Sequence, residues 1–122
     1  MSDTPRRFPA ALFARGQEPD PRFTLANERT FLSWIGAALA LIAAGVALEA
    51  LGLGLTSGLR IAASMLLIAA GIATPVQAWL GWYRTELALR EGRPLPAPFL
   101  VAPLALVVVA AGVLVALGVL LR

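Results

Sequence analysis

The sequence predicts an all-α membrane protein with three transmembrane helices. Of its 122 residues, 59% are hydrophobic and only 14% are charged, which leaves too little polar surface for a soluble domain of this size. Three apolar runs, at residues 31–48, 61–83 and 99–121, each have about the twenty residues that cross roughly 30 Å of hydrocarbon. Because lipid offers the backbone no hydrogen-bond partners, each run is expected to be a helix.

The residues that flank the apolar runs predict where the helices begin and end. We expect helices at about residues 21–49, 59–91 and 98–121. Asp20 is a suitable N-cap with Pro21 at the first helical position, and Gly92 suits a left-handed C-cap after the second helix. Within the second helix, Glu86 and Arg90 have the spacing of an i,i+4 ion pair.

Residues 1–19 are expected to be a mobile cytosolic leader, and residues 20–122 a single three-helix transmembrane domain. The first apolar run does not resemble a cleaved signal peptide. Thirty residues precede it, acidic ones among them, and no small-residue cleavage pattern follows.

The distribution of arginines predicts the orientation of the helices. Five precede the first apolar run and three lie in the link between the second and third, whereas the other link and the C-terminus hold one each. Positive residues favour the cytoplasmic side, so we expect a cytoplasmic N-terminus and a C-terminus outside. The aromatic residues at the helix ends on the inner side agree with this orientation: Trp34, Trp79, Trp82, Tyr83 and Phe99.

Catalysis is not expected from this chain. Cysteine and histidine are absent, which excludes disulfides, thiolate nucleophiles, zinc sites of the usual kind and the commonest general base. No nucleotide-binding loop, metal-ligand cluster or nucleic-acid-binding pattern is present, so we predict no enzyme activity, cofactor, metal or nucleic-acid partner. The third apolar run has no polar side chain, and its role is expected to be structural.

Glu28 and Arg29 stand directly before the first apolar run. Neighbours on a helix point about 100° apart, so these two charges cannot pair with each other. Arg29 continues along the helix into a stripe of small residues: Ser33, Gly36, Ala40 and Ala44. Such a stripe allows close helix contact or lines a narrow space. Two interpretations are open for these residues. Either both are separate interfacial charges, with Arg29 on lipid phosphate and Glu28 in water, or they are part of a binding site.

The second helix carries polar residues on one face of its inner half. Thr74, Gln77, Gly81 and Arg84 follow the spacing i, i+3, i+7 and i+10. A glutamine amide about two turns inside an apolar run is costly without a partner, and Pro75 is expected to bend the helix. Two interpretations are open: a packing hydrogen bond between helices, or a polar lining that leads to Arg84.

The strings "LANERTFLSW" and "GWYRTELALREGRPLPAP" resemble the YidH-like small membrane proteins, a bacterial domain family of unknown function. The likeness covers about residues 20–122 and implies a multi-pass protein of the bacterial inner membrane. The same domain resembles the membrane part of the eukaryotic vacuolar transporter chaperone, which makes polyphosphate and passes it across a membrane. In that complex, three-helix subunits surround a passage lined by basic residues.

This resemblance implies roles for particular residues. Glu28 and Arg29 match a Glu-Arg pair at the inner mouth and gate, and Arg84 matches a basic residue after the aromatic end of the second helix. A cytosolic basic rim is expected from Arg22, Arg90 and Arg93, and a possible polar lining from Ser33, Thr74 and Gln77. The chain has no polymerase or phosphate-sensing domain, so polyphosphate synthesis is not expected.

The function expected from these features is an oligomeric conduit or binding scaffold for an anion such as phosphate or polyphosphate. Arg29 and Arg84 would attract the anion and Glu28 would set the gate, in a lipid-embedded homo-oligomer for which a pentamer is the first guess. One alternative is a non-transporting accessory subunit that docks a partner protein. Another is a proton-coupled exporter of the small multidrug type. This alternative fits less well, because those exporters use an acidic residue deep in the first helix, whereas Glu28 lies at the mouth of the helix.

Overall fold

In the computed structural model, which describes residues 7–122, the chain is helical without strands in the described part. A short helix α1 (Ala10–Phe13) precedes three long helices, α2 (Pro21–Ala50), α3 (Ser57–Glu91) and α4 (Val101–Leu120). Each long helix is long and apolar enough to cross a membrane. The prediction of an all-α protein with three transmembrane helices is therefore confirmed, while the orientation of the termini stays a prediction.

The helix ends follow from local chemistry. The Asp20 side chain accepts a hydrogen bond from the backbone amide of Arg22 at 2.9 Å. Pro21 occupies the first turn, where its missing N–H group removes no hydrogen bond within the helix. α3 ends at Gly92, whose φ of 66° lies in the left-handed region that glycine tolerates. The amide of Arg93 then donates to the carbonyl of Ala88 at 2.9 Å.

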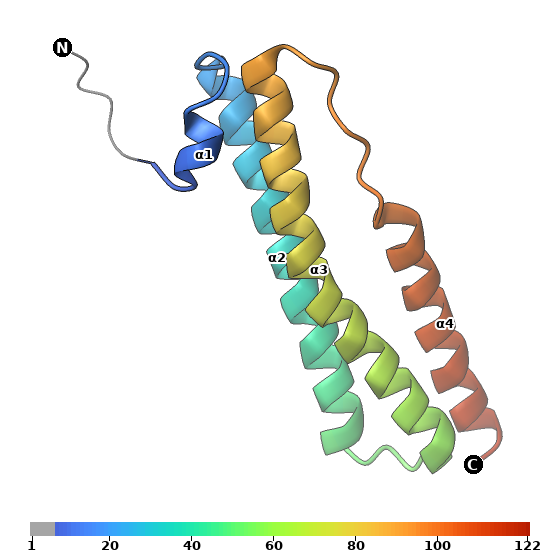
Figure 1. Ribbon diagram of the computed structural model, residues 1–122. Coiled ribbons are helices and arrows are strands. Elements are labelled where there is room, and N and C mark those ends of the chain that lie inside the picture. Colours follow the sequence, from blue (N-terminus) through green and yellow to red (C-terminus); the bar gives the residue numbers. More distant parts are fainter. Residues whose placement is uncertain (1–6) are drawn as a thin grey trace.

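The three long helices form an open array rather than a closed bundle. α2 and α3 lie antiparallel and pack along their length (Figure 1). Among the helices of the described chain, α4 contacts only α3, and it diverges from α3 toward the loop of residues 92–100. A single copy therefore encloses no passage between its three helices.

Two glycines allow α2 and α3 to approach closely. A Cβ atom on Gly45 would lie 2.6 Å from Ile68 Cγ1 and 2.9 Å from the carbonyl oxygen of Ser64. One on Gly71 would lie 2.5 Å from Ile42 Cγ1 and 3.0 Å from the carbonyl oxygen of Ala38. Real Cβ atoms do not occupy such positions, so this contact depends on the absence of side chains.

α3 bends near its middle (Figure 1), where Pro75 lies within the helix. Proline lacks the amide that would donate to the carbonyl four residues earlier, and its ring crowds that turn. The neighbouring Thr74 hydroxyl donates to the carbonyl of Ala70 at 2.6 Å. The bend expected from the sequence is therefore present.

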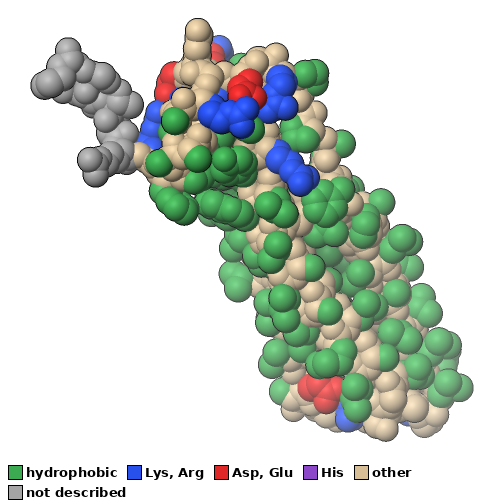
Figure 2. Space-filling model, viewed as in Figure 1, with side chains coloured by type: hydrophobic (Ala, Val, Ile, Leu, Met, Phe, Trp, Pro, Cys, Tyr) green, Lys and Arg blue, Asp and Glu red, His purple; other side chains and the backbone are tan. Residues whose placement is uncertain are grey.

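Most of the apolar surface is not covered by the chain itself. In the most apolar 18-residue stretch of each long helix, only 22% of the residues are buried in α2, 22% in α3 and 11% in α4. Hydrophobic side chains cover the long middle of the molecule, and charged ones gather toward its two ends (Figure 2). We call the end with α1, the last turns of α3 and residues 92–100 the basic end. The uncovered apolar surface of the three long helices is available to lipid or to other protein chains.

We expect Gly71→Ala to reduce the free energy of unfolding by about 1–3 kcal/mol, because the new methyl group forces α2 and α3 apart. Thermal unfolding in detergent, followed by tryptophan fluorescence, measures the loss. Gly112→Ala is the matched control, since no atom lies within 4 Å of its Cβ position, and it should leave the transition unchanged or slightly raised. Equal transitions for the two variants would contradict the close contact.

Candidate functional site at the basic end

Most charged side chains in the described part of the chain have an oppositely charged partner. The ion pairs are Arg7–Glu18 (2.7 Å), Arg15–Glu91 (2.8 Å), Arg22–Asp20 (2.8 Å), Arg60–Glu49 (3.4 Å), Arg90–Glu18 (3.3 Å) and Arg93–Glu91 (2.8 Å). Arg122 instead donates to the carbonyl of Leu53 at 3.4 Å. These pairs neutralise much of the charge at the basic end.

Within residues 7–122, three charged side chains have neither a hydrogen bond nor an ion pair to another described residue: Glu28, Arg29 and Arg84. All three are exposed. They are the residues that the sequence predicts for the anion site or gate. Their charges are thus available to groups outside the protomer.

Arg29 lies on the face of α2 that points away from α3. Ala38 is buried against α3. Arg29 lies nine residues before it, and at about 100° per residue it therefore points to the opposite side of the helix. Ser33 and Gly36 lie on the same outward side and are exposed, and no atom lies within 4 Å of the Cβ position of Gly36. The small-residue stripe beside Arg29 is therefore uncovered in the protomer.

Arg84 lies on a different face, at a pocket of about 350 Å³ between α2, α3 and residues 92–100. Thr30, Trp34, Trp82, Thr85 and Phe99 are among its lining residues, and Arg84 is the one charged side chain there. Glu28 and Arg29 do not line this pocket. The structure therefore does not bring the three expected anion-site residues together within one protomer.

The residues expected to form a polar lining are also separated. Ser33 is exposed on α2, whereas Thr74 and Gln77 are buried on α3. The Thr74 hydroxyl bonds within its own helix rather than to another. Gln77 is 4% exposed, and its Oε1 has no hydrogen-bond partner among the described residues. The structure shows no continuous polar face that joins the three.

A buried polar cluster joins α2 to α3. The side chain of Glu86 is 1% exposed and accepts hydrogen bonds from Thr24 Oγ1 at 3.1 Å and Asn27 Nδ2 at 3.2 Å. Asn27 also donates to the carbonyl of Trp82 at 3.1 Å. The expected ion pair between Glu86 and Arg90 is not formed, because α2 supplies donors to Glu86 and other acceptors surround Arg90.

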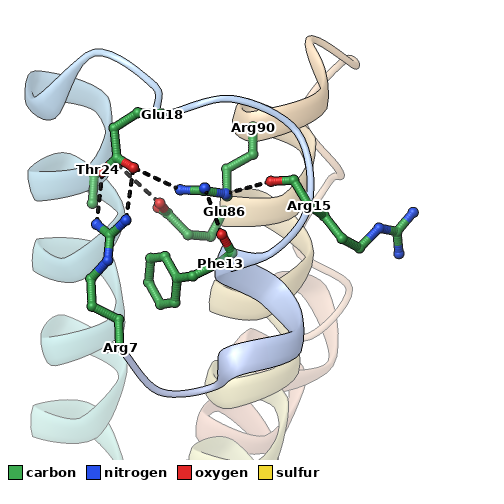
Figure 3. Close-up of polar contacts among 7 residues, drawn as sticks. All are labelled: Arg7, Phe13, Arg15, Glu18, Thr24, Glu86 and Arg90. Atoms are coloured by element: carbon green, nitrogen blue, oxygen red, sulfur yellow. Dashed lines mark hydrogen bonds and ion pairs between the residues drawn. The ribbon is translucent and has the colours of Figure 1, made fainter. Parts of the chain in front are cut away.

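Arg90 holds the segment of residues 7–18, which we call the cap, against α3 (Figure 3). Its guanidinium donates to the carbonyls of Arg15 at 2.8 Å and Phe13 at 3.0 Å, and to the carboxylate of Glu18 at 3.3 Å. The backbone amide of Gln17 donates to the carbonyl of Arg90 at 2.9 Å. Each of the three guanidinium nitrogens thus donates to one acceptor from the cap.

Side chains of the cap complete this contact. The Arg7 guanidinium binds both oxygens of Glu18 at 2.7 Å and lies 4.2 Å from the centre of the Phe13 ring. Leu12 is fully buried. Gly16 has a φ of 61°, and a Cβ there would collide with the carbonyl of Arg90. These contacts require the particular residues that the cap carries.

These findings revise the expectations for the leader and the basic rim. The leader, expected to be mobile, is docked against α3 from residue 7 onward, and residues 1–6 lie outside the described part. Arg90 is buried in the cap contact rather than placed on a rim. Arg22 and Arg93 are exposed, but carboxylates two residues away neutralise them. The rim is therefore less basic than its arginines imply.

The guanidinium of Arg7, with a smaller contribution from Arg90, lowers the pKa of Glu18 from its ordinary 4.5 to about 2. A lowered pKa means that the ionised carboxylate stabilises the docked cap fully above the ordinary value and loses this effect as the pH falls through about 2. The ion pairs of the cap are therefore fully charged throughout the neutral range.

The sequence contains a signal for the buried cluster that the prediction missed. Residues 27, 34, 41 and 48 follow a seven-residue step along α2, and Leu41 and Leu48 are buried. Asn27 is the polar member of this inward stripe, and a buried amide requires a partner on the facing helix. No comparable signal marks the cap, because its contacts join residues more than 70 positions apart.

The fold and the charged end define a small multi-pass helical membrane protein. The model of a family described as "Domain of unknown function (DUF202)" matches residues 22–88, more than half of the chain. The chain belongs to this family, and the resemblance to YidH-like proteins inferred from the motifs is confirmed. No solved structure matches it.

Bacterial relatives agree with this assignment. The chain is 41% identical over 100 residues to the inner membrane protein YidH of Escherichia coli strain K12, across 78% of this chain and 85% of YidH. It is 48% identical over 80 residues to the uncharacterized protein Rv2272 of Mycobacterium tuberculosis, across 65% of this chain and 66% of that protein, just under two thirds of its length. With its three spans, the chain is a multi-pass inner-membrane protein.

We expect Arg90→Ala to release the cap, because three acceptors lose their shared donor. Trypsin should then cleave after Arg15 about tenfold faster or more, since hydrogen bonds to a charged group contribute roughly 1.5–3 kcal/mol. Mass spectrometry of timed digests measures the rate at this bond. Arg93→Ala, which removes an exposed arginine nearby, should leave the rate unchanged. Equal rates for both variants would show that Arg90 does not hold the cap.

Proposed function

We propose that this inner-membrane protein is a homo-oligomer that binds an anion such as phosphate or polyphosphate at its basic end, as a conduit or as a binding scaffold. The observation that carries the proposal is the set of partnerless charges, Glu28, Arg29 and Arg84, because every other charged side chain among the described residues has an ion pair or a hydrogen bond. Guanidinium groups bind phosphate oxygens through charged, often bidentate hydrogen bonds. The arginine distribution supports a cytoplasmic location for this end.

The need for several copies follows from the open array. Because α4 contacts only α3 among the described helices, one protomer cannot surround an ion path. Arg29 points away from α3, beside the uncovered stripe that includes Gly36. Packing this face against a second protomer would bring arginines from different copies toward a common space. Such a ring of side chains is a usual means of anion selection in pores.

Glu28 fits the same assembly. It cannot pair with Arg29 of its own helix, and it does not line the pocket at Arg84. In a ring, the glutamate of one copy can approach the arginine of the next and limit how tightly an anion is held. A site that releases its cargo needs this balance.

Docking of a partner protein is the second candidate, because the uncovered face of α2 would also suit a foreign helix. The two candidates differ in a measurable way. If the protein is an accessory subunit, substitutions at Arg29 abolish co-purification of a partner and leave anion movement at the background level of empty vesicles.

We expect Arg29→Ala to slow the release of phosphate or short polyphosphate from proteoliposomes by about tenfold or more, because one charge-assisted contact per copy is lost. Release is measured with a phosphate assay on the external buffer. Arg122→Ala is the control, since it removes one exposed guanidinium from the opposite end. Wild-type vesicles that release anion no faster than protein-free vesicles would refute the conduit.

We expect Gly36→Leu to separate the oligomer into protomers without unfolding them, because the leucine obstructs the uncovered face and meets no atom of its own chain within 4 Å of the Cβ position. Light scattering combined with size exclusion in detergent gives the mass, and thermal unfolding reports the protomer. Gly112→Ala serves as the control on α4. An unchanged mass would place the interface elsewhere.

A further inference from the structure

A second site emerges where α4 separates from α3. The pocket at Arg84, of about 350 Å³, adjoins a groove of about 470 Å³ along α3. Ile72, Val76 and Leu80 line the groove, and Phe99 lines both cavities. We call these two neighbouring cavities together the channel; Arg84 lies at one end, and the groove is apolar except for Gln77. Each volume lies within the roughly 300–1,000 Å³ typical of small-molecule sites.

The charged end of this channel suits a phosphate group. Arg84 has no hydrogen bond or ion pair to another described residue, and the hydroxyls of Thr30 and Thr85, which also line the pocket, hydrogen-bond to none. A guanidinium with two hydroxyls offers several donors and no acceptor stronger than a hydroxyl oxygen. The single positive charge of Arg84 matches the single negative charge of a phosphodiester group.

The position of the channel relative to lipid suits the same ligand. Arg84 directly follows the aromatic residues Trp82 and Tyr83, which are typical of the level of lipid headgroups. The groove runs from there along α3 through residues of the apolar span, between that helix and the start of α4. In a membrane, the exposed residues of this apolar span would face the hydrocarbon layer.

We propose that this channel binds one anionic phospholipid, with its phosphate on Arg84, Thr30 and Thr85 and an acyl chain in the groove along α3 beside Phe99 and Leu100. Arg84 attracts the phosphate, and the apolar groove excludes a ligand without a tail. A zwitterionic phospholipid binds less well because its ammonium group opposes the guanidinium. The lipid fills the gap that α4 leaves beside α3.

Two other occupants fit the channel less well. A dissolved phosphate would use Arg84 but would leave the apolar groove empty. A helix from a second copy needs small residues at its contact, and besides Ala69 and Ala73 the groove presents branched and bulky side chains. The uncovered small-residue face lies on α2 instead. A headgroup with a flexible chain satisfies both parts of the channel.

This inference deepens the proposed function, since it rests on Arg84 as an anion-binding group and assigns the lipid phosphate as its ligand. The dissolved anion of the conduit would then meet Arg29 on the other face of α2. The two proposals can fail separately, because anion release depends on Arg29 and lipid selection on Arg84.

The test measures quenching of tryptophan fluorescence by brominated lipids. Two of the three tryptophans, Trp34 and Trp82, line the pocket, and Trp79→Phe provides a background in which only these two remain. Full-length protein is reconstituted in phosphatidylcholine vesicles that contain a minor fraction of brominated phosphatidylglycerol or of brominated phosphatidylethanolamine with the same chains. We expect about tenfold stronger apparent binding of phosphatidylglycerol, the size expected for one charge-assisted contact.

Substitutions then assign the selectivity to Arg84. Arg84→Gln should reduce the preference to about onefold, and Arg84→Lys should retain part of it because the charge remains. Arg93→Gln is the control: it removes an exposed arginine at the same end that does not line the pocket, and it should retain all of the preference. Arg84 has no partner among the described residues, so its loss is not expected to unfold the protein.

Three results would overturn the inference. The first is equal quenching by the two brominated lipids in the wild-type sequence. The second is relief of quenching by millimolar inorganic phosphate, which would identify a site for the dissolved anion. The third is an efficient disulfide between copies of Ala97→Cys, whose parent residue lines the pocket, since this would identify a second copy as the occupant.

Discussion

The close contact between α2 and α3 is the constraint on which the rest of the structure depends. Gly45 and Gly71 remove side chains where the helices meet, and van der Waals packing replaces the hydrophobic driving force that is absent between helices in lipid. With this spacing fixed, Asn27 reaches both Glu86 and the carbonyl of Trp82. The same pair of helices carries the cap on one flank and the pocket at Arg84 beside residues 92–100 on the other. A wider separation would break the polar cluster and open the pocket together.

Polar satisfaction explains which charges are left for function. Burial of Glu86 and Arg90 is tolerated because each finds several hydrogen-bond partners within the chain, and a buried charge without partners would cost several kcal/mol. The same reasoning applied to Glu28, Arg29 and Arg84 gives a different result. They are exposed and have no described partner, so the protomer neither requires nor restrains them. Groups of this kind are candidates for contacts with ligands, lipid or other copies.

The fold was largely predictable from the sequence, since lipid imposes helices on long apolar runs and since Asp20, Pro21 and Gly92 are strong local signals for helix ends. The sequence also predicted Glu28, Arg29 and Arg84 as candidate site residues from position and motif, but it did not predict that they lie on different faces. The cap was missed because Arg90 bonds to carbonyls that any residue could supply at positions 13 and 15. The spacing of Glu86 and Arg90 predicted an ion pair within α3. Glu86 instead accepts hydrogen bonds from side chains of α2.

We propose different neighbours for the two uncovered faces of the array, and the proposal rests on their side chains. Along α2, Ser33 and Gly36 leave the backbone accessible, and only another helix can use such a surface fully, because helix backbones gain contact when small residues let them approach. Beside α3, Val76 and Leu80 project into a gap that α4 does not close. A flexible acyl chain can follow these side chains and preserve packing density. In our proposals the protein neighbour therefore belongs on α2 and the lipid neighbour beside α3, and the partnerless arginine on each face attracts an anion from a different phase.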